Sequence, residues 1–362
     1  MKIIFIASLK SYTTAISLIK SFQNQQHDVV VLSDVESDYI QVNTIVRQNF
    51  NIDKYVEQNN LKPDLVFFCE GGSMKLFPQG LEELECKTAW YGIDTHMDLQ
   101  KHLEIAKFFD ITFLAQKEYI QNFKQVGIKN IFWLPLAYDT AMAPNEQYER
   151  IYDIAYVGSN NRDMHPVRFE LIEKLKKEFP NSYFGRASGK EMYKIYSQAK
   201  IVFNKSINND INMRYFEALG NGAMLLTDKV VNNGVEDIFE KNKHYIEYSE
   251  LDIIDIAKKY LKKNIDNSTV LQEYIKSNHT YDIRSIKIVE TVNSCLKVSK
   301  IIGNIDYMKV YLMLENFVAL LEIFESIVYS DIIRNSKKRK LVFLPLLSVL
   351  VLMTLLLKKL GR

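Results

Sequence analysis

The sequence is poor in cysteine and lacks the short motifs that mark several large enzyme classes. Its 362 residues contain three cysteines, Cys69, Cys86 and Cys295, without the paired spacing of a metal or redox site. So few cysteines are typical of a reducing compartment. The motifs HExxH, GxxxxGK[ST] and GxSxG do not occur. The sequence therefore does not favour a zinc hydrolase, a P-loop nucleotidase or an α/β-hydrolase.

The chain also lacks a strong excess of charge of either sign. Its 46 Lys and Arg residues against 44 Asp and Glu residues give a formal net charge of +2. A near-neutral chain has no overall nucleic-acid footprint, so we expect no nucleic-acid partner. The composition, with 47% apolar and 25% charged residues, is that of a globular protein long enough for two domains.

Short β-branched or aromatic runs alternate with helical segments through most of the chain. Strands are expected in the first half at 2–8, 29–32, 65–69, 88–91, 111–114 and 131–134, with helices such as 12–25 and 99–109 between them. After a polar stretch at 144–150 the alternation restarts, with strands at 154–157, 182–184, 201–204 and 224–227 and helices at 167–179, 190–198, 213–219 and 281–299. This α/β pattern predicts two Rossmann-like, doubly wound parallel sheets that face a cleft. We expect a first domain over 1–145 and a second over 151–300.

The most informative stretch runs from residue 208 to residue 228. Arg214 and Glu217 lie three apart on an expected helix and so share one face. The N-terminus of that helix adds an anion site. One turn thus offers a cation for a diphosphate and a carboxylate for ribose hydroxyls, and Gly222 ends the helix before a buried strand. The stretch predicts a nucleotide-sugar site, although an exposed glutamate paired with a nearby base remains the plain alternative for Glu217.

Two further segments of the second half place polar groups after strands, where ligands bind in such sheets. The loop of Gly158, Ser159 and Arg162 is a phosphate-loop candidate with one glycine, and a simple turn is the alternative. Arg168 is a second cation near this loop. Lys205 follows the strand at 201–204 and would neutralise charge on a departing diphosphate, unless it is a solvated lysine at a strand end.

The first half offers groups for the other side of the cleft. Asp94 and His96 follow the strand at 88–91 and would hydrogen-bond sugar or acceptor hydroxyls. Glu70 and the glycines after it occupy the same position behind the strand at 65–69, and we expect them to line the acceptor side. A lone histidine in such a place is often only structural.

The residues around these candidates resemble a known family. The block from Tyr152 to Asp228 is similar to the second domain of group 1 glycosyltransferases, in the subgroup named after a spore-maturation protein (CgeB-like). The matching pieces are Tyr156-Val157-Gly158, the segment from Arg214 to Gly222, Leu225-Leu226-Thr227-Asp228, the segment from His279 to Arg284, and Trp90-Tyr91-Gly92-Ile93-Asp94 in the first half.

The resemblance implies a GT-B fold, in which the second domain holds a nucleoside diphosphate sugar and the first holds the acceptor. It also implies retention of the anomeric configuration and no bound metal or other cofactor. Glu217 matches the second of two glutamates in the family's pattern, with the implied role of binding the donor ribose. The first falls at Asn209, which is not acidic, with Asp210 adjacent. Asn209 and Asp210 are therefore expected on the donor side.

We accordingly expect a glycosyltransferase that acts on an acceptor hydroxyl of a cell-envelope glycan, a glycolipid or a protein. Lys205 and Arg214 would stabilise the leaving diphosphate, while Asp94 and His96 would orient the sugar or acceptor. Two alternatives stay open. One is a catalytically silent module that binds a nucleotide or glycan at a membrane, and the other is a GT-B transferase of polyol phosphate.

The C-terminal part of the sequence is strongly apolar. We expect a helical extension over 301–336, with an apolar helix at 307–329, and then an apolar run at 341–357 between basic residues. As a helix this run would be about 25 Å long at ~1.5 Å per residue, slightly short of a ~30 Å hydrocarbon core. It predicts a membrane anchor or interfacial helix that attaches a cytoplasmic protein to the cytoplasmic face of the membrane, with a buried core helix as the alternative.

Overall fold

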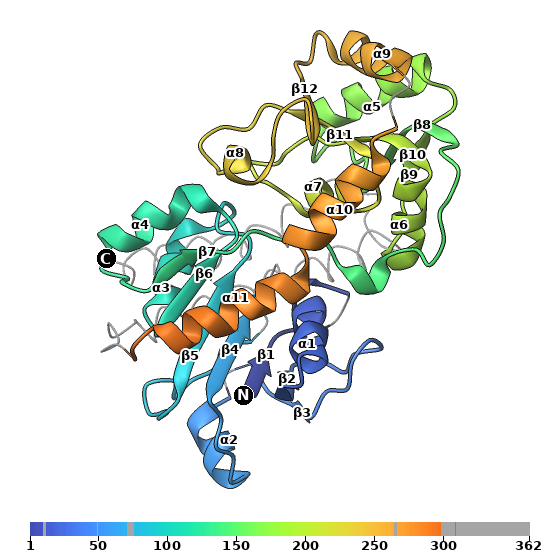
Figure 1. The fold of residues 1–362 in the computed structure, drawn as a ribbon. Coiled ribbons are helices and arrows are strands. Elements are labelled where there is room, and N and C mark those ends of the chain that lie inside the picture. The colour runs from blue at the N-terminus through green and yellow to red at the C-terminus, as the bar shows by residue number, and fades with distance from the viewer. Residues whose placement is uncertain (10–11, 49, 71–75, 264–265, 298–307, 309–362) are drawn as a thin grey trace, which may run out of the picture.

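The computed structural model describes residues 1–9, 12–48, 50–70, 76–263, 266–297 and 308, and shows two parallel β-sheets (Figure 1). The first sheet has the strand order β3-β2-β1-β4-β5-β6-β7, and the second has the order β12-β11-β10-β8-β9. The first-sheet strands are β1 (Lys2–Ile6), β2 (Asp28–Ser33), β3 (Thr44–Ile45), β4 (Leu65–Cys69), β5 (Lys87–Gly92), β6 (Ile111–Leu114) and β7 (Ile131–Trp133). The second-sheet strands are β8 (Tyr152–Val157), β9 (Tyr183–Gly185), β10 (Ala199–Phe203), β11 (Met224–Asp228) and β12 (Tyr245–Tyr248).

Helices connect the strands and cover the sheets. In the first half they are α1 (Thr14–Asn24), α2 (Ile52–Gln58), α3 (Leu99–Ala106) and α4 (Ile120–Gln125). In the second half they are α5 (Pro166–Glu178), α6 (Gly189–Ser197), α7 (Met213–Gly220), α8 (Val235–Ile238), α9 (Ile253–Lys263), α10 (Ser268–Asn278) and α11 (Tyr281–Ser294). All five residues of β4 are buried, as expected for a parallel strand covered on both faces. The predicted class of two parallel α/β sheets is confirmed.

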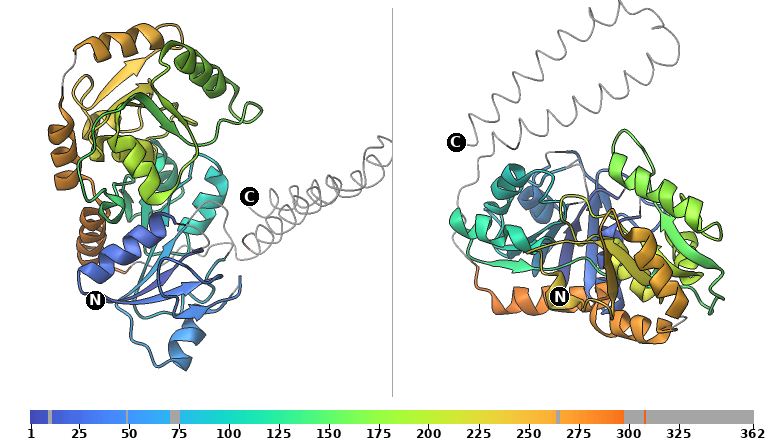
Figure 2. Two further views of the ribbon diagram at one scale, coloured as in Figure 1. Left: turned by 90° about the vertical axis from the view of Figure 1, so that its right-hand side faces the viewer. Right: turned by 90° about the horizontal axis from the view of Figure 1, so that it is seen from above.

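The last described helix, α11, returns from the second half of the chain to the first. It packs along α1, and α10 stays beside α7 (Figures 1 and 2). The Gln25 side-chain amide donates to Ser285 Oγ at 2.6 Å, and Lys87 Nζ donates to the Val292 carbonyl at 2.6 Å. The chain therefore crosses between the two sheets twice, once after β7 and once between α10 and α11.

Asp139 joins the two halves at the first crossing. Its carboxylate accepts hydrogen bonds from the Tyr12 hydroxyl, from Ser17 Oγ at 2.7 Å and from the Ala141 N–H at 2.8 Å. Its own N–H donates to the Tyr193 hydroxyl at 3.2 Å. Only 5% of Asp139 is exposed, and its partner Ser17 is buried beside it.

Asp139→Ala should therefore lower the free energy of unfolding by about 3 kcal/mol, because a buried acceptor of three hydrogen bonds, one of them from the buried Ser17, is lost. Chemical denaturation of the variant and the parent protein measures this difference. Asp38→Ala, at an exposed position, is the control and should change stability by less than about 0.5 kcal/mol. Equal effects of the two substitutions would contradict the role given to Asp139.

The predicted apolar segments at 307–329 and 341–357 lie outside the described residues, except for Met308. Within the part of the chain that the structure describes, no helix has the length and apolar character needed to span a bilayer.

Candidate functional site

Helix α7 begins at the carboxyl edge of the second sheet and points its first turn at the first domain. The Asn212 side chain caps the helix by accepting the Arg214 N–H at 3.1 Å. Met213 Sδ lies 4.0 Å from the hydroxyls of Thr14 and Tyr281, which belong to α1 and α11. The first turn of α7 thus lies where the two domains meet.

Arg214 is anchored in the second domain by its planar guanidinium group. Nη1 donates to Asn204 Oδ1 at 2.8 Å, Nη2 to the Val157 carbonyl at 2.9 Å and Nε to the Tyr196 hydroxyl at 3.1 Å. The group also lies 4.7 Å from the centre of the Tyr156 ring. These contacts use three of five N–H donors and no carboxylate. The cation is therefore fixed in place, with two N–H donors left for a ligand.

Arg168, from the first turn of α5, places a second guanidinium 5.9 Å from the centre of the same Tyr156 ring. Only 7% of Arg168 is exposed, and its Nε has no hydrogen-bond partner among the described residues. Burial, together with the charge of Arg214, lowers the pKa of Arg168. Within the described part of the chain no carboxylate lies within ion-pair distance of either arginine. Two neighbouring cations without an ion-pair partner are a candidate anion site.

Gly158 lets the backbone approach these cations. A Cβ atom at this position would lie 2.8 Å from the Tyr156 hydroxyl and 3.2 Å from Arg214 Nη2. The Ser159 carbonyl accepts the Tyr156 hydroxyl at 3.1 Å, which fixes the loop between β8 and α5. The glycine of the predicted phosphate loop therefore lies against Arg214.

Glu217 follows Arg214 by one turn of α7 and is also buried, with 8% of its surface exposed. Its carboxylate has no hydrogen bond or ion pair in the described part of the chain, and burial raises its pKa to about 7, although Arg214 acts in the opposite direction. The carboxylate therefore has no hydrogen-bond donor from the described part of the protein. A ligand that brings hydroxyl donors would satisfy it.

Lys205 and Arg162 are less available than these two arginines. Lys205 Nζ lies 2.8 Å from Asp228 Oδ2, and the other oxygen of that carboxylate accepts the Ser206 N–H at 2.7 Å. Arg162 is exposed and lies 5.6 Å from the centre of the Phe169 ring. The sequence showed both as cations after strands, but their partners come from other segments.

Asn209 and Asp210 differ in what they contact. The Asn209 side chain donates to the Val231 carbonyl at 2.6 Å and accepts the Val231 N–H at 2.8 Å, so its amide already joins two loops. Asp210 faces the first domain, where Gln116 Nε2 donates to its carboxylate at 3.2 Å. Burial raises the pKa of Asp210 to about 6, although the hydrogen bond from Gln116 opposes the shift. Of the two neighbours, Asp210 is the ionisable group at the junction.

Gly222 lies at the other end of α7, away from the arginine pair. Its φ of +76° is a left-handed conformation, and a Cβ there would lie 2.4 Å from Arg150 Nη2. The glycine therefore fits the turn from α7 into β11 beside Arg150. The donor-binding role expected for Gly222 stays a prediction.

Asp94 and His96 follow β5 and come close to Asp210 across the domain junction. Burial raises the pKa of Asp94, and both residues affect the titration of the Asp210 carboxylate. His96 Nδ1 is buried without a hydrogen-bond partner among the described residues. The structure thus brings together the two predicted first-domain residues and one predicted second-domain residue.

A buried network under this loop was not apparent from the sequence. Glu70 lies 2.8 Å from His102 Nε2 and 2.9 Å from Lys101 Nζ, and His102 Nδ1 lies 3.0 Å from Thr95 Oγ1. Thr95 and His102 have no exposed surface, so this arrangement offers no nucleophile to a substrate. Gln116 Oε1 also accepts the Thr95 N–H at 3.2 Å. Glu70 thus does not line the acceptor side as expected, but supports the loop that carries Asp94 and His96.

Comparison with known proteins supports the resemblance inferred for the second half. Residues 147–290 match a family described as glycosyl transferase-like. The match covers the second domain and not the first. The second domain contains the arginine pair, Glu217 and Asp210. No curated protein matches the chain, and the more specific CgeB-like subgroup stays a prediction.

Several solved structures share the fold of both domains. The HepE protein of Anabaena, solved with UDP, is 10% identical with a TM-score of 0.55, over 81% of this chain and 100% of its own. Sucrose-phosphate synthase from Thermosynechococcus elongatus is 9% identical with a TM-score of 0.54, over 81% of this chain and 98% of its own. An alpha-glucosyltransferase solved with UDP and DNA is 10% identical with a TM-score of 0.52, over 81% of this chain and 99% of its own. The predicted GT-B fold is confirmed.

Proposed function

We propose that the protein transfers a sugar from a nucleoside diphosphate sugar to an acceptor hydroxyl. The observation that carries this proposal is the pair of guanidinium groups of Arg168 and Arg214, which share the Tyr156 ring and have no carboxylate partner. A glycosyl transferase-like domain with an unpaired double cation suits a donor diphosphate. UDP is the first nucleotide to test, because HepE was solved with UDP and with UDP-glucose.

In this reaction the bond from the anomeric carbon to the diphosphate oxygen breaks, and the acceptor oxygen forms the new bond. Negative charge develops on the diphosphate, where Arg168, Arg214 and the backbone N–H groups of Gly158 and Ser159 would stabilise it. Lys205 would add charge if a ligand draws it from Asp228. Arg214 is held in place before the substrate arrives, so this cation needs little reorganisation in the reaction.

Glu217 would bind the ribose of the donor through its two hydroxyl groups. Hydroxyl groups that donate hydrogen bonds favour the ionised carboxylate. Binding of the nucleotide sugar should therefore lower the pKa of Glu217 from about 7. On the acceptor side, Asp94, His96 and Asp210 would orient the donor sugar and the incoming hydroxyl. The hydroxyl proton would leave to one of these groups or to the departing diphosphate.

Thermal unfolding in the presence of UDP, GDP, dTDP, ADP and CMP tests the donor site directly. A nucleotide that binds only the folded state at ~100 times its Kd stabilises that state by about 2.7 kcal/mol. We expect one nucleotide to raise Tm and Glu217→Gln to remove most of that rise. If none of the five has an effect, the donor site is wrong, and the silent-module and polyol-phosphate alternatives gain support.

Product analysis then tests the reaction class. We propose retention of the anomeric configuration and an acceptor in a cell-envelope glycan, a glycolipid or a protein. The configuration of the product decides the stereochemistry. A putative UDP-N-acetylglucosamine 2-epimerase from Listeria monocytogenes also has this fold. It is 13% identical with a TM-score of 0.52, over 81% of this chain and 96% of its own. Donor consumption without acceptor glycosylation would therefore contradict the transferase proposal.

We also propose that the apolar run at 341–357 attaches the protein to the cytoplasmic face of a membrane. Its basic flanks and apolar length support this proposal. A protein shortened after Ser336 should move from the membrane fraction to the soluble fraction, as measured by flotation with vesicles. If the shortened protein still floats, another segment binds the membrane.

A further inference from the structure

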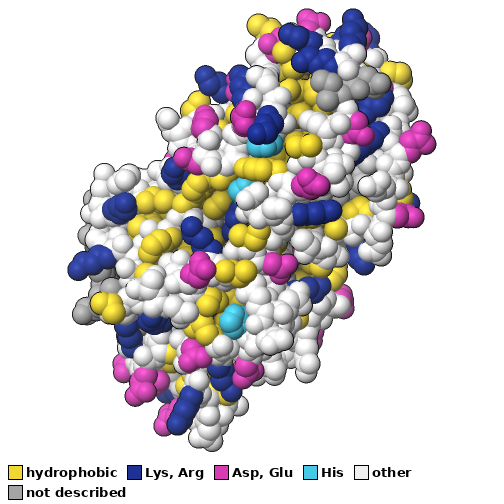
Figure 3. All heavy atoms as spheres, viewed as in Figure 1, with side chains coloured by type: hydrophobic (Ala, Val, Ile, Leu, Met, Phe, Trp, Pro, Cys, Tyr) yellow, Lys and Arg dark blue, Asp and Glu magenta, His cyan; other side chains and the backbone are white. Residues whose placement is uncertain are grey.

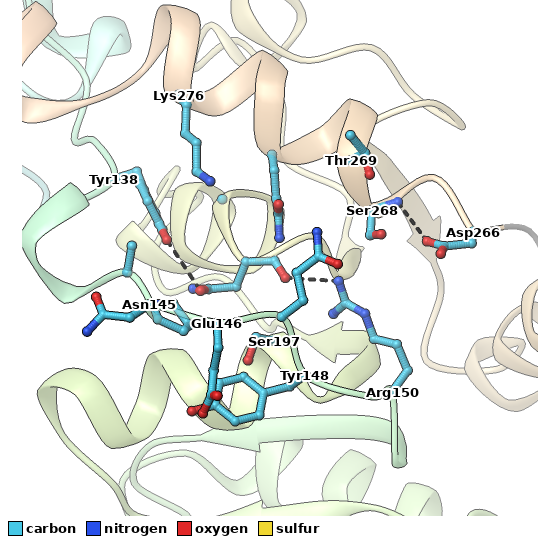
Figure 4. Close-up of a pocket in the computed structure, with 16 residues that line it drawn as sticks. Tyr138, Asn145, Glu146, Tyr148, Arg150, Ser197, Asp266, Ser268, Thr269 and Lys276 are labelled. Atoms are coloured by element: carbon cyan, nitrogen blue, oxygen red, sulfur yellow. Dashed lines mark hydrogen bonds between the residues drawn. The ribbon is translucent and has the colours of Figure 1, made fainter.

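A second polar cavity lies at the crossing between the two domains (Figure 4). It has a volume of about 340 Å³, at the lower end of ligand pockets, which span ~300–1,000 Å³. Its walls are the segment 143–150, Tyr138, the C-terminal end of α7 and the exposed side of α10. We call this cavity the hinge pocket.

The hinge pocket is separate from the proposed donor site. Gly220 and Asn221 line it, and they lie about 9 Å along the axis of α7 from Arg214, at ~1.5 Å per residue. Arg214 occupies the first turn of this helix, whereas the hinge pocket lies against its last turn. One short helix therefore contacts both sites.

The charges on the pocket wall balance, and each acidic group has a partner of its own. Two cations, Arg150 and Lys276, and two carboxylates, Glu146 and Asp266, line the pocket. The Asp266 carboxylate accepts the Ser268 N–H at 3.0 Å. The Glu146 carboxylate lies beside Tyr148 and raises the pKa of that hydroxyl, while Lys276 extends from α10 into the pocket (Figure 4). A strongly charged ligand would meet both signs of charge here.

The remaining wall consists mainly of groups that both donate and accept hydrogen bonds. These uncharged side chains belong to Asn145, Gln147, Ser197, Ser268, Thr269 and Gln272. Amides and hydroxyls of this kind match the hydroxyl groups of a sugar, each of which donates and accepts. The sparse apolar surface gives little support to a lipid or a flat aromatic ligand.

Asn221 links the pocket to the proposed donor site. Its side-chain amide donates to the Glu217 carbonyl at 2.8 Å, and its side-chain oxygen accepts the Tyr138 hydroxyl at 3.3 Å. Its own carbonyl accepts Arg150 Nη2 at 3.0 Å. A ligand that holds Asn221 in place therefore also restrains α7, the helix that carries Glu217.

We propose that the hinge pocket binds a neutral sugar ring, and that its occupation is coupled through Asn221 to donor affinity at Glu217. Sugar binding stands on the pocket alone, whereas the coupling rests on the proposed function.

Calorimetric titration of the full chain with glucose, galactose, N-acetylglucosamine and maltose tests sugar binding. At least one of these probes should bind, and Gln272→Met should weaken it about tenfold or more, because a hydrogen-bonding side chain is replaced by one of similar size. Lys276→Met is a second pocket variant should Gln272→Met fail to fold. Lys259→Met on α9, at an exposed position outside the pocket, is the control and should bind the sugar as the parent protein does.

Three outcomes would overturn the proposal. The first is that none of the four sugars binds, and the second is that binding survives both pocket variants. The third is that glucose 6-phosphate binds more tightly than glucose, since that result identifies an anion site. For the coupling, a saturating sugar should change the Kd for UDP about fivefold or more. If UDP does not bind, the nucleotide of the five that raises Tm takes its place. An unchanged Kd overturns the coupling, whereas failure of all five nucleotides to bind counts against the proposed function and leaves the sugar result intact.

Discussion

Arg168→Gln should lower kcat/KM for sugar transfer by about 100-fold or more, because glutamine lacks the charge that would meet the leaving diphosphate. The same change should leave the free energy of unfolding unchanged or raise it. Arg168 is buried without a carboxylate, and a buried unpaired charge costs stability. Steady-state kinetics with the donor sugar and chemical denaturation of the same sample measure the two effects.

Lys174→Gln provides the matched control, since it removes a cation from an exposed position on the same helix. Its kcat/KM should stay within a few-fold of the parent value. A similar loss in both variants would indicate a general effect of charge on α5. A loss of activity in Arg168→Gln that merely follows a loss of folded protein would remove Arg168 from the site.

Glu217→Gln should abolish donor binding and yet stabilise the folded protein at alkaline pH. The pKa of Glu217 is about 7 in the folded protein against 4.5 for an ordinary glutamate. Between these values the folded state binds more protons than the unfolded state, so the free energy of unfolding falls as the pH rises from 4.5 to 7. At pH 8 the ionised carboxylate costs about 3 kcal/mol, which glutamine avoids. At pH 4 the two proteins should be equally stable.

Denaturation curves at pH 4, 6 and 8 measure this difference, with Glu290→Gln on the exposed side of α11 as control. The control should show no gain that grows with pH. If Glu217→Gln is equally or less stable than the parent protein at pH 8, the carboxylate has a partner in the folded state, and it is not an open acceptor for a ribose. Such a cost in a ligand-free site, relieved by a ligand, is typical of binding sites selected for function.

Most strands and helices that position the site follow from the sequence alone. The expected strands at 65–69 and 111–114 have those bounds in the structure, and the expected helix at 213–219 is α7 with one more residue. These segments are continuous apolar runs or amphipathic turns, which can be recognised from neighbouring residues in the sequence. The edge strands β3 and β12 were missed. β3 has only two residues, neither of them buried, and β12 has only four, which is too short for a clear pattern.

The site was less predictable, because its chemistry depends on contacts between distant segments. Arg214 and Glu217 could be found as a pair on one helical face, but the importance of Arg168 depends on Tyr156, twelve positions earlier on another element. The residues near Lys205 in the sequence do not show that it pairs with Asp228. Those near Asn209 do not show that its side-chain amide hydrogen-bonds to the backbone of Val231. The sequence reveals which polar groups are present, and only the fold reveals which of them already have hydrogen-bond or ion-pair partners within the protein.

The return of α11 to the first domain has a consequence for synthesis on the ribosome. The first sheet is complete once β7 ends at Trp133, but α11 ends at Ser294, 161 positions later (294 − 133). At ~5–20 residues per second, roughly 8–32 s pass before that helix can dock. Until then the surface that Ile288 and Val292 cover faces water. The nascent first domain thus has an exposed apolar surface until α11 is made. Folding of the first domain is completed only after the second domain has been synthesised.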